Sequence, residues 1–376
     1  MLHHRHAGLG RRRPRRDRVR RLALRLVLAI TAGLLLLVAA QAAALWWSWR
    51  SVERTAFDEA AFAALPPVGA TAIDLPVVEG DGGPAIDPLT TRSERMGWSG
   101  TPVEPPAASA GPDIDQATDP FDAYLIVGSD EGDTRADVIM LALLPTDGAA
   151  PLLVSLPRDL YLPNRCTGGL TRLNANYNGC GADVNGPTQL AGAVTDFTGI
   201  EIDHFALFTM DGFERIIDAV GGMEICVDNP VREDTRLDLP AGCSRVDGRM
   251  ALGWVRSRMT EELVDGRWRV MPQVNDLTRN QRQQELLLTV LARVGEFDSP
   301  GDLSGFAASL GDAFTLDDRL GLADAAELAW RHRDLSADAI VRLQIPVRSH
   351  VTAGGAQVLL PTEPFAATLA AGLTAG

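Results

Sequence analysis

Carboxylates and guanidinium groups gather between residues 122 and 159, where three short apolar segments end. These charged residues include Asp130, Arg135 and Asp137 in the first connection, and Arg158 and Asp159 after the third segment. Carboxylate oxygens are suitable ligands for Mg²⁺, and the planar arginine fork binds phosphate oxygens in pairs. The residue types therefore indicate a site for an anion and a metal ion, with two charged surface turns as the alternative.

Further arginines occur at the ends of two later helices. Arg256 and Arg258 follow a predicted helix that starts at Asp247, while Arg279 and Arg282 lie at the start of another. The formal net charge is −14, and residues 1–50 hold eleven arginines and one aspartate, so the rest of the chain carries −24. Repeated arginines in so acidic a body indicate a common anionic ligand; the alternative is a set of solvated surface arginines.

The composition excludes several functions. All 35 basic residues are arginine, so no Schiff-base lysine, pyridoxal-phosphate anchor or P-loop lysine is possible. The six histidines are scattered or lie at the N-terminus, which does not favour a histidine-rich zinc site. The acidic body has no extended basic surface for nucleic acid. The segment VGSDEG does not fit the nucleophile-elbow pattern G-x-S-x-G, so serine hydrolysis is not predicted.

Alternating strands and helices must position these charges. Short aliphatic segments bounded by Gly, Pro or Asp predict strands at residues 123–127, 138–144, 151–154, 204–210 and 223–227. Amphipathic segments predict helices at 187–197 and 281–294, and another that Asp211 caps at its N-terminus. This pattern predicts a three-layer α-β-α domain with a central mixed sheet.

The N-terminal third of the chain predicts a membrane anchor. Residues 1–25 form an arginine-rich tail, and residues 26–47 contain no charge and are long enough to span a bilayer. The arginines before the span predict a cytoplasmic N-terminus and place everything after it outside the cell. A cleaved signal peptide is the alternative. Residues 48–119 are rich in Pro and Gly and predict an extracellular linker. Residues 120–376 are predicted to form the folded extracellular domain.

Four cysteines without CxxC spacing fit an exported domain with disulfides. The local pairings Cys166–Cys180 and Cys226–Cys243 are favoured among the three possible connectivities. The alternative is that the cysteines are free and buried in the core.

Seven segments in order resemble the LytR-CpsA-Psr family of cell-wall glycopolymer transferases, actinobacterial members above all. They are YLIVGSDEGDTRADVIML, SLPRDLYLP, TRLNANYN, GIEIDHFALFTMDGFERIIDAVGGMEICV, LPAGC, VDGRMALGWVRSR and DLTRNQRQQELL, and they cover roughly residues 120–295. The resemblance implies an extracellular α/β domain with a hydrophobic pocket for a polyprenyl chain. It further implies a pyrophosphate at the pocket mouth, bound by arginines and Mg²⁺.

The resemblance also implies roles for individual residues. Asp130 and Asp137 would hold Mg²⁺, and together with Arg158 and Arg256 they would form the catalytic set. The pyrophosphate would be bound by Arg135, Arg158, Arg256, Arg258 and Arg279. Asp159, Arg282 and Gln283 would have supporting roles, with Asp159 orienting Arg158. The connection between Asp130 and Asp137 is shorter than is usual in the family and reads RADV where the family has RSDT.

The implied reaction is transfer of a glycopolymer from a polyprenyl-pyrophosphate carrier to a peptidoglycan hydroxyl, the C6 hydroxyl of muramic acid. Two alternatives remain at this point. The same site could use water and act as a pyrophosphatase on lipid-linked donors, or the protein could bind or regulate the cell wall without catalysis. In each case the resemblance implies a single-pass protein of the cell membrane.

Overall fold

A computed structural model describes residues 42–44, 46–47, 49–68, 121–129, 134–146, 148–257, 259–271, 276–295, 313–332 and 335–375. Residues 1–41, which contain the predicted tail and most of the predicted span at 26–47, lie outside this part of the chain. Within the described ranges, no helix is both long enough and apolar enough to cross a membrane.

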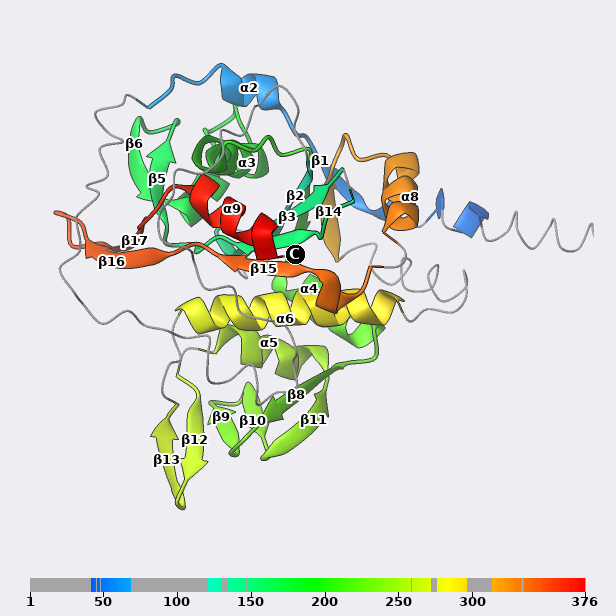
Figure 1. Cartoon of the computed structure of the whole chain (residues 1–376), viewed down its shortest axis with the longest axis vertical. Coiled ribbons are helices and arrows are strands. Elements are labelled where there is room, and N and C mark those ends of the chain that lie inside the picture. The colour runs from blue at the N-terminus through cyan, green and yellow to red at the C-terminus, as the bar shows by residue number, and fades with distance from the viewer. Residues whose placement is uncertain are drawn as a thin grey trace, which may run out of the picture.

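A central mixed sheet of seven strands organises the described part of the chain (Figure 1). In spatial order its strands are β1 (Glu53–Thr55), β14 (Phe314–Asp317), β7 (His204–Phe208), β2 (Phe121–Ser129), β3 (Ala136–Pro145), β4 (Leu152–Ser155) and β15 (Val341–Gln344). The pairs β1/β14, β7/β2 and β4/β15 are parallel, and the other neighbouring pairs are antiparallel. The predicted central mixed sheet is therefore confirmed.

Helices cover both faces of this sheet. One face carries α2 (Glu59–Ala63), α3 (Gly186–Thr198) and α9 (Phe365–Ala375), and the other carries α4 (Met210–Ala219), α5 (Gly248–Arg256) and α6 (Asp276–Gly295), as Figure 1 shows. Strand β3 serves both layers because successive side chains point to opposite faces. Leu141 packs in the core with α3, whereas Val138 and Met140 pack against Leu288 of α6.

The remaining elements are smaller. A four-stranded sheet contains β10 (Leu237–Leu239), β9 (Val231–Glu233), β12 (Glu261–Val264) and β13 (Arg267–Val270). The two-stranded pairs are β8 (Met223–Val227) with β11 (Gly242–Val246), β5 (Tyr161–Asn164) with β6 (Gly169–Arg172), and β16 (Val347–Val351) with β17 (Gln357–Pro361). Helix α8 (Leu322–Arg331) and the 3₁₀ helices η3 (Leu173–Asn178) and η4 (Ala337–Ala339) complete the described elements.

Part of the predicted linker belongs to the folded domain. Within residues 48–119, β1 pairs in parallel with β14 at the sheet edge, and α2 packs on α3. The Phe62 ring of α2 fills the space above Gly192 of α3, where an added Cβ would lie 2.3 Å from the ring. The partners of this segment lie more than 100 residues away along the chain, so no local pattern reveals the pairing. Residues 69–119, the rest of the predicted linker, lie outside the described ranges.

The local predictions agree with the structure except at one helix start. All five predicted strands are present, and β8 pairs with β11 outside the central sheet. The predicted cap Asp211 is wrong, because α4 begins one residue earlier, at Met210. The Thr209 side chain is the N-cap and accepts a hydrogen bond from Gly212 N at 3.1 Å. Asp211 lies in the first turn of α4, where its charge still suits the helix dipole.

Both predicted disulfides, Cys166–Cys180 and Cys226–Cys243, are confirmed. We expect the double variant Cys226→Ser, Cys243→Ser to lose about 3 kcal/mol of unfolding free energy. The disulfide closes a loop of sequence separation 17, and opening it restores entropy to the unfolded chain. Urea unfolding, compared with the wild type under the same non-reducing conditions, measures the loss. An unchanged midpoint and slope would show that pairing of β8 with β11 is sufficient without the covalent link.

Candidate active site

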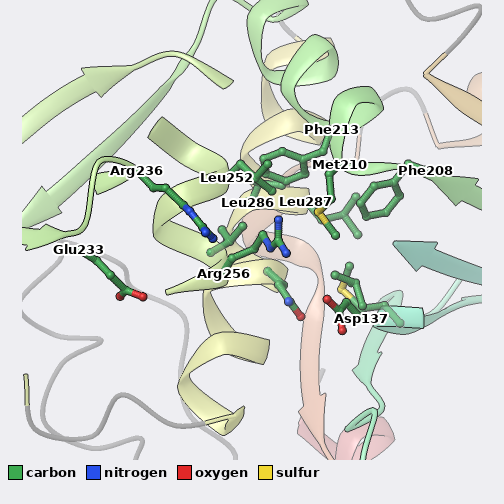
Figure 2. A pocket seen from close by; sticks show the side chains of 14 residues that line it. Asp137, Phe208, Met210, Phe213, Glu233, Arg236, Leu252, Arg256, Leu286 and Leu287 are labelled. Atoms are coloured by element: carbon green, nitrogen blue, oxygen red, sulfur yellow. The ribbon is translucent and has the colours of Figure 1, made fainter. Parts of the chain in front are cut away.

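A cavity of about 350 Å³ lies between the central sheet and helices α4, α5 and α6 (Figure 2). Nine of its fourteen lining residues are apolar, namely Val138, Met140, Phe208, Met210, Phe213, Leu252, Val255, Leu286 and Leu287. The polar lining residues are Asp137, Glu233, Arg236, Arg256 and Gln283. A concave apolar site with a few convergent charges fits an amphiphilic ligand that has a hydrocarbon part and an anionic part.

Asp137 and Arg158 form an ion pair at one side of this cavity. The Arg158 Nη1 donates a hydrogen bond to Asp137 Oδ1 at 2.5 Å, and the two side chains are 16% and 22% exposed. The antiparallel pairing of β3 with β4 explains their meeting. Asp137 lies three residues before Met140, whose register partner is Ser155, and Arg158 lies three residues after Ser155. The start of one strand and the end of its neighbour therefore share one edge.

Asp159 and Arg172 extend this pair into a chain of alternating charges. Asp159 Oδ2 lies 3.5 Å from Arg158 Nε, and Asp159 Oδ1 lies 3.2 Å from Arg172 Nε. Arg172 also donates from Nη2 to the Gln357 carbonyl oxygen at 2.8 Å. The expected contact of Asp159 with Arg158 is thus present. Arg172 was missed, although it belongs to the segment TRLNANYN, because its link to Asp159 depends on how β6 packs.

Arg256 is the last residue of α5 and lines the cavity. The Asp247 side chain caps this helix by accepting a hydrogen bond from Met250 N at 2.9 Å. In the view of Figure 2, the Arg256 guanidinium lies between Asp137 of β3 and Arg236 of the β9–β10 connection. A guanidinium in this place can bind an anion at the edge of the apolar lining.

Arg282 and Gln283 of α6 surround the end of α5. The Arg282 guanidinium stacks on the Trp254 ring at 3.7 Å and donates from Nη1 to the Trp254 carbonyl oxygen at 3.0 Å. Because Trp254 lies two residues before Arg256, this buried arginine fixes the helix end that carries Arg256. Gln283 is 6% exposed and lines the cavity itself.

The other predicted site residues lie elsewhere or outside the described ranges. Arg135 precedes β3, is exposed and is not among the residues that line the cavity. Asp130 and Arg258 lie outside the described residues. Arg279 lies in α6, and the placement of its side chain is not described. From the predicted set, Asp137, Arg256 and Gln283 line the cavity, and Arg158 pairs with Asp137 beside it.

Glu233 and Arg236 line the cavity and were missed by sequence reasoning. They occur in the charged segment REDTR, which a sequence pattern does not distinguish from an ordinary surface turn. The only signal was the charge of that segment between the apolar residues Val231 and Leu237. Packing of this hairpin against α5 decides its place.

The donor atoms at the cavity suit Mg²⁺ better than a softer metal. Asp137 offers hard carboxylate oxygen at the rim, and Mg²⁺ is usually held by one or two carboxylates together with substrate phosphates. Among the residues that the structure describes, the clustered group of potential ligands is Glu224, Cys226 and Cys243. Its two cysteines form a disulfide, so they are not available as thiolate ligands.

The fold and the cavity together define a class of protein, an α/β domain with a cavity between its central sheet and one helical layer. The chain belongs to the LytR_cpsA_psr family, whose model matches residues 100–371. The expectation drawn from the seven sequence segments is therefore confirmed at the level of the family.

Individual relatives and solved structures agree with this membership. The chain is 37% identical over 177 residues to the probable cell wall biosynthesis protein LcpB of Corynebacterium glutamicum, covering 47% of this chain and 37% of LcpB. It is 30% identical over 253 residues to LcpA of the same organism, covering 60% of this chain and 46% of LcpA. The matches thus span less than half of either relative.

Among solved structures, the LytR-Csp2A-Psr enzyme from Actinomyces oris superposes with a TM-score of 0.56 at 30% identity, covering 71% of this chain and 92% of that one. TagV of Bacillus subtilis has a TM-score of 0.54 at 20% identity and covers 69% of this chain and 96% of its own. That likeness supports the fold alone.

Proposed function

We propose that this chain is a membrane-anchored phosphotransferase that moves a glycopolymer from a polyprenyl-pyrophosphate carrier onto peptidoglycan. The observation that carries this proposal is the cavity between β3 and α6, which has nine apolar lining residues together with Arg256 and Asp137, the partner of Arg158. An apolar interior suits the prenyl chain, and guanidinium groups at its edge suit the pyrophosphate.

The names of related proteins support the reaction type. A relative of 27% identity over 194 residues, TagV of Bacillus subtilis, is a polyisoprenyl-teichoic acid–peptidoglycan teichoic acid transferase by name. TagU of Enterococcus faecalis, of the same identity over 221 residues, carries the same activity in its name. We extend that reaction class to this chain and propose the C6 hydroxyl of muramic acid as the acceptor.

The proposed step is a phosphoryl transfer. The acceptor hydroxyl oxygen bonds to the sugar-side phosphorus, and the bond from that phosphorus to the bridging oxygen breaks. Polyprenyl monophosphate leaves with the bridging oxygen and takes up the proton that the hydroxyl loses, and the glycan is joined to peptidoglycan as a phosphodiester. Because the pyrophosphate is already activated, catalysis depends on orienting the groups and neutralising charge.

The residues of this chain divide these tasks. Arg158 and Arg256 bind phosphate oxygens, and Asp159 keeps Arg158 in place through their 3.5 Å contact. Arg135, Arg258 and Arg279 remain proposed phosphate ligands. Asp137 and Asp130 would hold Mg²⁺, which supplies positive charge to the phosphates when bound.

A product assay tests this function. The full chain in detergent would be incubated with a radiolabelled polyprenyl-pyrophosphate glycan, with and without peptidoglycan. Label that becomes attached to peptidoglycan supports the transferase. Release of soluble glycan phosphate at the same rate in both samples would identify a pyrophosphatase, and an unchanged donor would favour a wall-binding or regulatory protein.

A further inference from the structure

Arg236 adds a second guanidinium to the cavity from an element that carries none of the predicted site residues. It lies at the end of the connection between β9 and β10, which turns through Asp234 at a φ of 47°. Its side chain lines the cavity, and Figure 2 shows it pointing from this connection toward Arg256. Arg236 is the more exposed of the two arginines, so it occupies the outer position.

The β9–β10 hairpin is held firmly against the helix that ends in Arg256. Glu233 Oε2 accepts a hydrogen bond from the Ser257 hydroxyl and another from Met259 N at 3.1 Å. The Arg236 carbonyl oxygen packs so closely on Gly253 of α5 that an added Cβ would lie 2.4 Å from it. These contacts fix the spacing between the backbones that carry Arg236 and Arg256.

The charges around Arg236 leave room for an anionic ligand. Within the described part of the chain, no carboxylate forms an ion pair with its guanidinium: Asp234 is close in sequence only, and Glu233, which also lines the cavity, accepts hydrogen bonds from Ser257 and Met259. Two guanidinium groups that point into one cavity repel each other unless an anion lies between them. Phosphate oxygens are well suited to this place because each arginine can bind two of them.

We propose that Arg236 binds the outer phosphate of the donor and thereby distinguishes the diphosphate from the monophosphate. This inference rests on the proposed function. In this assignment, Arg256 binds the phosphate next to the prenyl chain. Arg256 is the less exposed of the two arginines and lines the cavity together with Leu252 and Val255. Arg236, farther out, reaches the phosphate that carries the glycan.

This assignment links recognition to product release. Before transfer, the donor has two phosphates and contacts both arginines. Transfer moves the outer phosphate to the acceptor with the glycan, and the carrier keeps the inner phosphate alone. The monophosphate product then lacks the contact with Arg236, so it binds more weakly than the donor and leaves the cavity for the next one.

The test measures affinity for two simple lipids, geranylgeranyl pyrophosphate and geranylgeranyl monophosphate. Isothermal titration calorimetry on the full chain in detergent would give both dissociation constants. We expect the wild type to prefer the diphosphate by about 10- to 100-fold, the range for a charge-assisted hydrogen bond. Arg236→Ala should lose most of this preference and keep its affinity for the monophosphate, and Arg236→Lys should restore part of the preference.

Two further variants distinguish a failure of the Arg236 assignment from a failure of the proposed function. Arg267→Ala, which removes one exposed arginine from β13 outside the cavity lining, should keep the full preference. Arg256→Ala should weaken both lipids. If Arg256→Ala weakens both lipids but Arg236→Ala keeps the wild-type preference, the Arg236 assignment is overturned and the proposed function stands. If the wild type binds neither lipid, the proposed function fails and the Arg236 assignment fails with it.

Discussion

Replacing Arg256 with alanine is expected to lower the rate of glycopolymer transfer by about 1,000-fold, the lower range for an arginine that stabilises phosphoryl transfer. Arg256 lines the cavity at the end of α5, and the stack of Arg282 on Trp254 holds that helix end in place. The pyrophosphate charge would then lack a principal partner while the apolar lining remains. Initial rates of label transfer to peptidoglycan, at saturating donor, measure the effect.

Arg249→Ala is the matched control for this variant. Arg249 lies in the first turn of the same helix, is exposed and does not line the cavity, so the rate should change less than about twofold. Both variants should have the circular dichroism spectrum and melting temperature of the wild type. Wild-type rates in a folded Arg256→Ala protein would rule out this arginine as a phosphate ligand.

Replacing Asp317 with alanine is expected to lower the unfolding free energy by roughly 3–5 kcal/mol, the usual loss when one member of a buried charged pair is removed. Asp317 ends β14 and is fully buried. Its Oδ1 lies 3.1 Å from His204 Nδ1 and accepts hydrogen bonds from Arg319 N at 3.0 Å and Leu320 N at 2.9 Å. Its Oδ2 accepts a further bond from Phe205 N at 3.1 Å. Alanine would leave these donors buried without an acceptor.

The pH dependence of this loss follows from the pKa of Asp317. Burial is the largest influence and raises the pKa, but the hydrogen bond and charge of His204, with the backbone N–H groups of Phe205 and Leu320, lower it further than burial raises it. The folded pKa therefore lies below the ordinary value of 3.8. A lowered carboxylate pKa stabilises the folded state above 3.8, and this stabilisation disappears as the pH falls through the folded pKa.

Urea unfolding at several pH values tests both statements. The difference between wild type and Asp317→Ala should be constant at neutral pH and shrink only below pH 3.8. Glu327→Ala is the control, because Glu327 is 69% exposed and pairs with Arg331 at i,i+4, a contact worth about 0.5 kcal/mol or less. A loss no larger than this control would show that solvent or a neighbouring group replaces the Asp317 carboxylate.

The local chemistry of the chain was readable without the structure. Strand and helix periods are properties of neighbouring residues, so β2, β3, β4, β7 and β8 could each be predicted from composition and spacing. The Asp137–Arg158 pair was within reach for the same reason, because two short connected strands bring the residues before one and after the next to the same edge. The two disulfides join nearby cysteines, and short loops favour local pairing.

Contacts between segments that lie far apart in the sequence could be identified only from the tertiary structure. The pairing of β1 with β14 depends on residues more than 250 positions apart, and nothing in the segment ERT predicts it. Arg172 likewise meets Asp159 only because β6 folds back beside the connection after β4. In both cases the sequence shows the type of each residue. Only the packing of the core determines that the two residues come into contact.

The cavity shows most clearly what the sequence predicts and what only the tertiary structure determines. The sequence by itself determined the family, the strands, and the arginines and carboxylates that an anion site needs. The tertiary structure decided which of them share one cavity: Asp137 and Arg256 line it and Arg158 pairs with Asp137 beside it, while Arg135 does not line it. It also brought in Arg236, because the close packing of its backbone on Gly253 places it beside Arg256. That packing depends on how the surfaces of the β9–β10 hairpin and of α5 fit together, and this fit cannot be predicted from the spacing of residues along the chain.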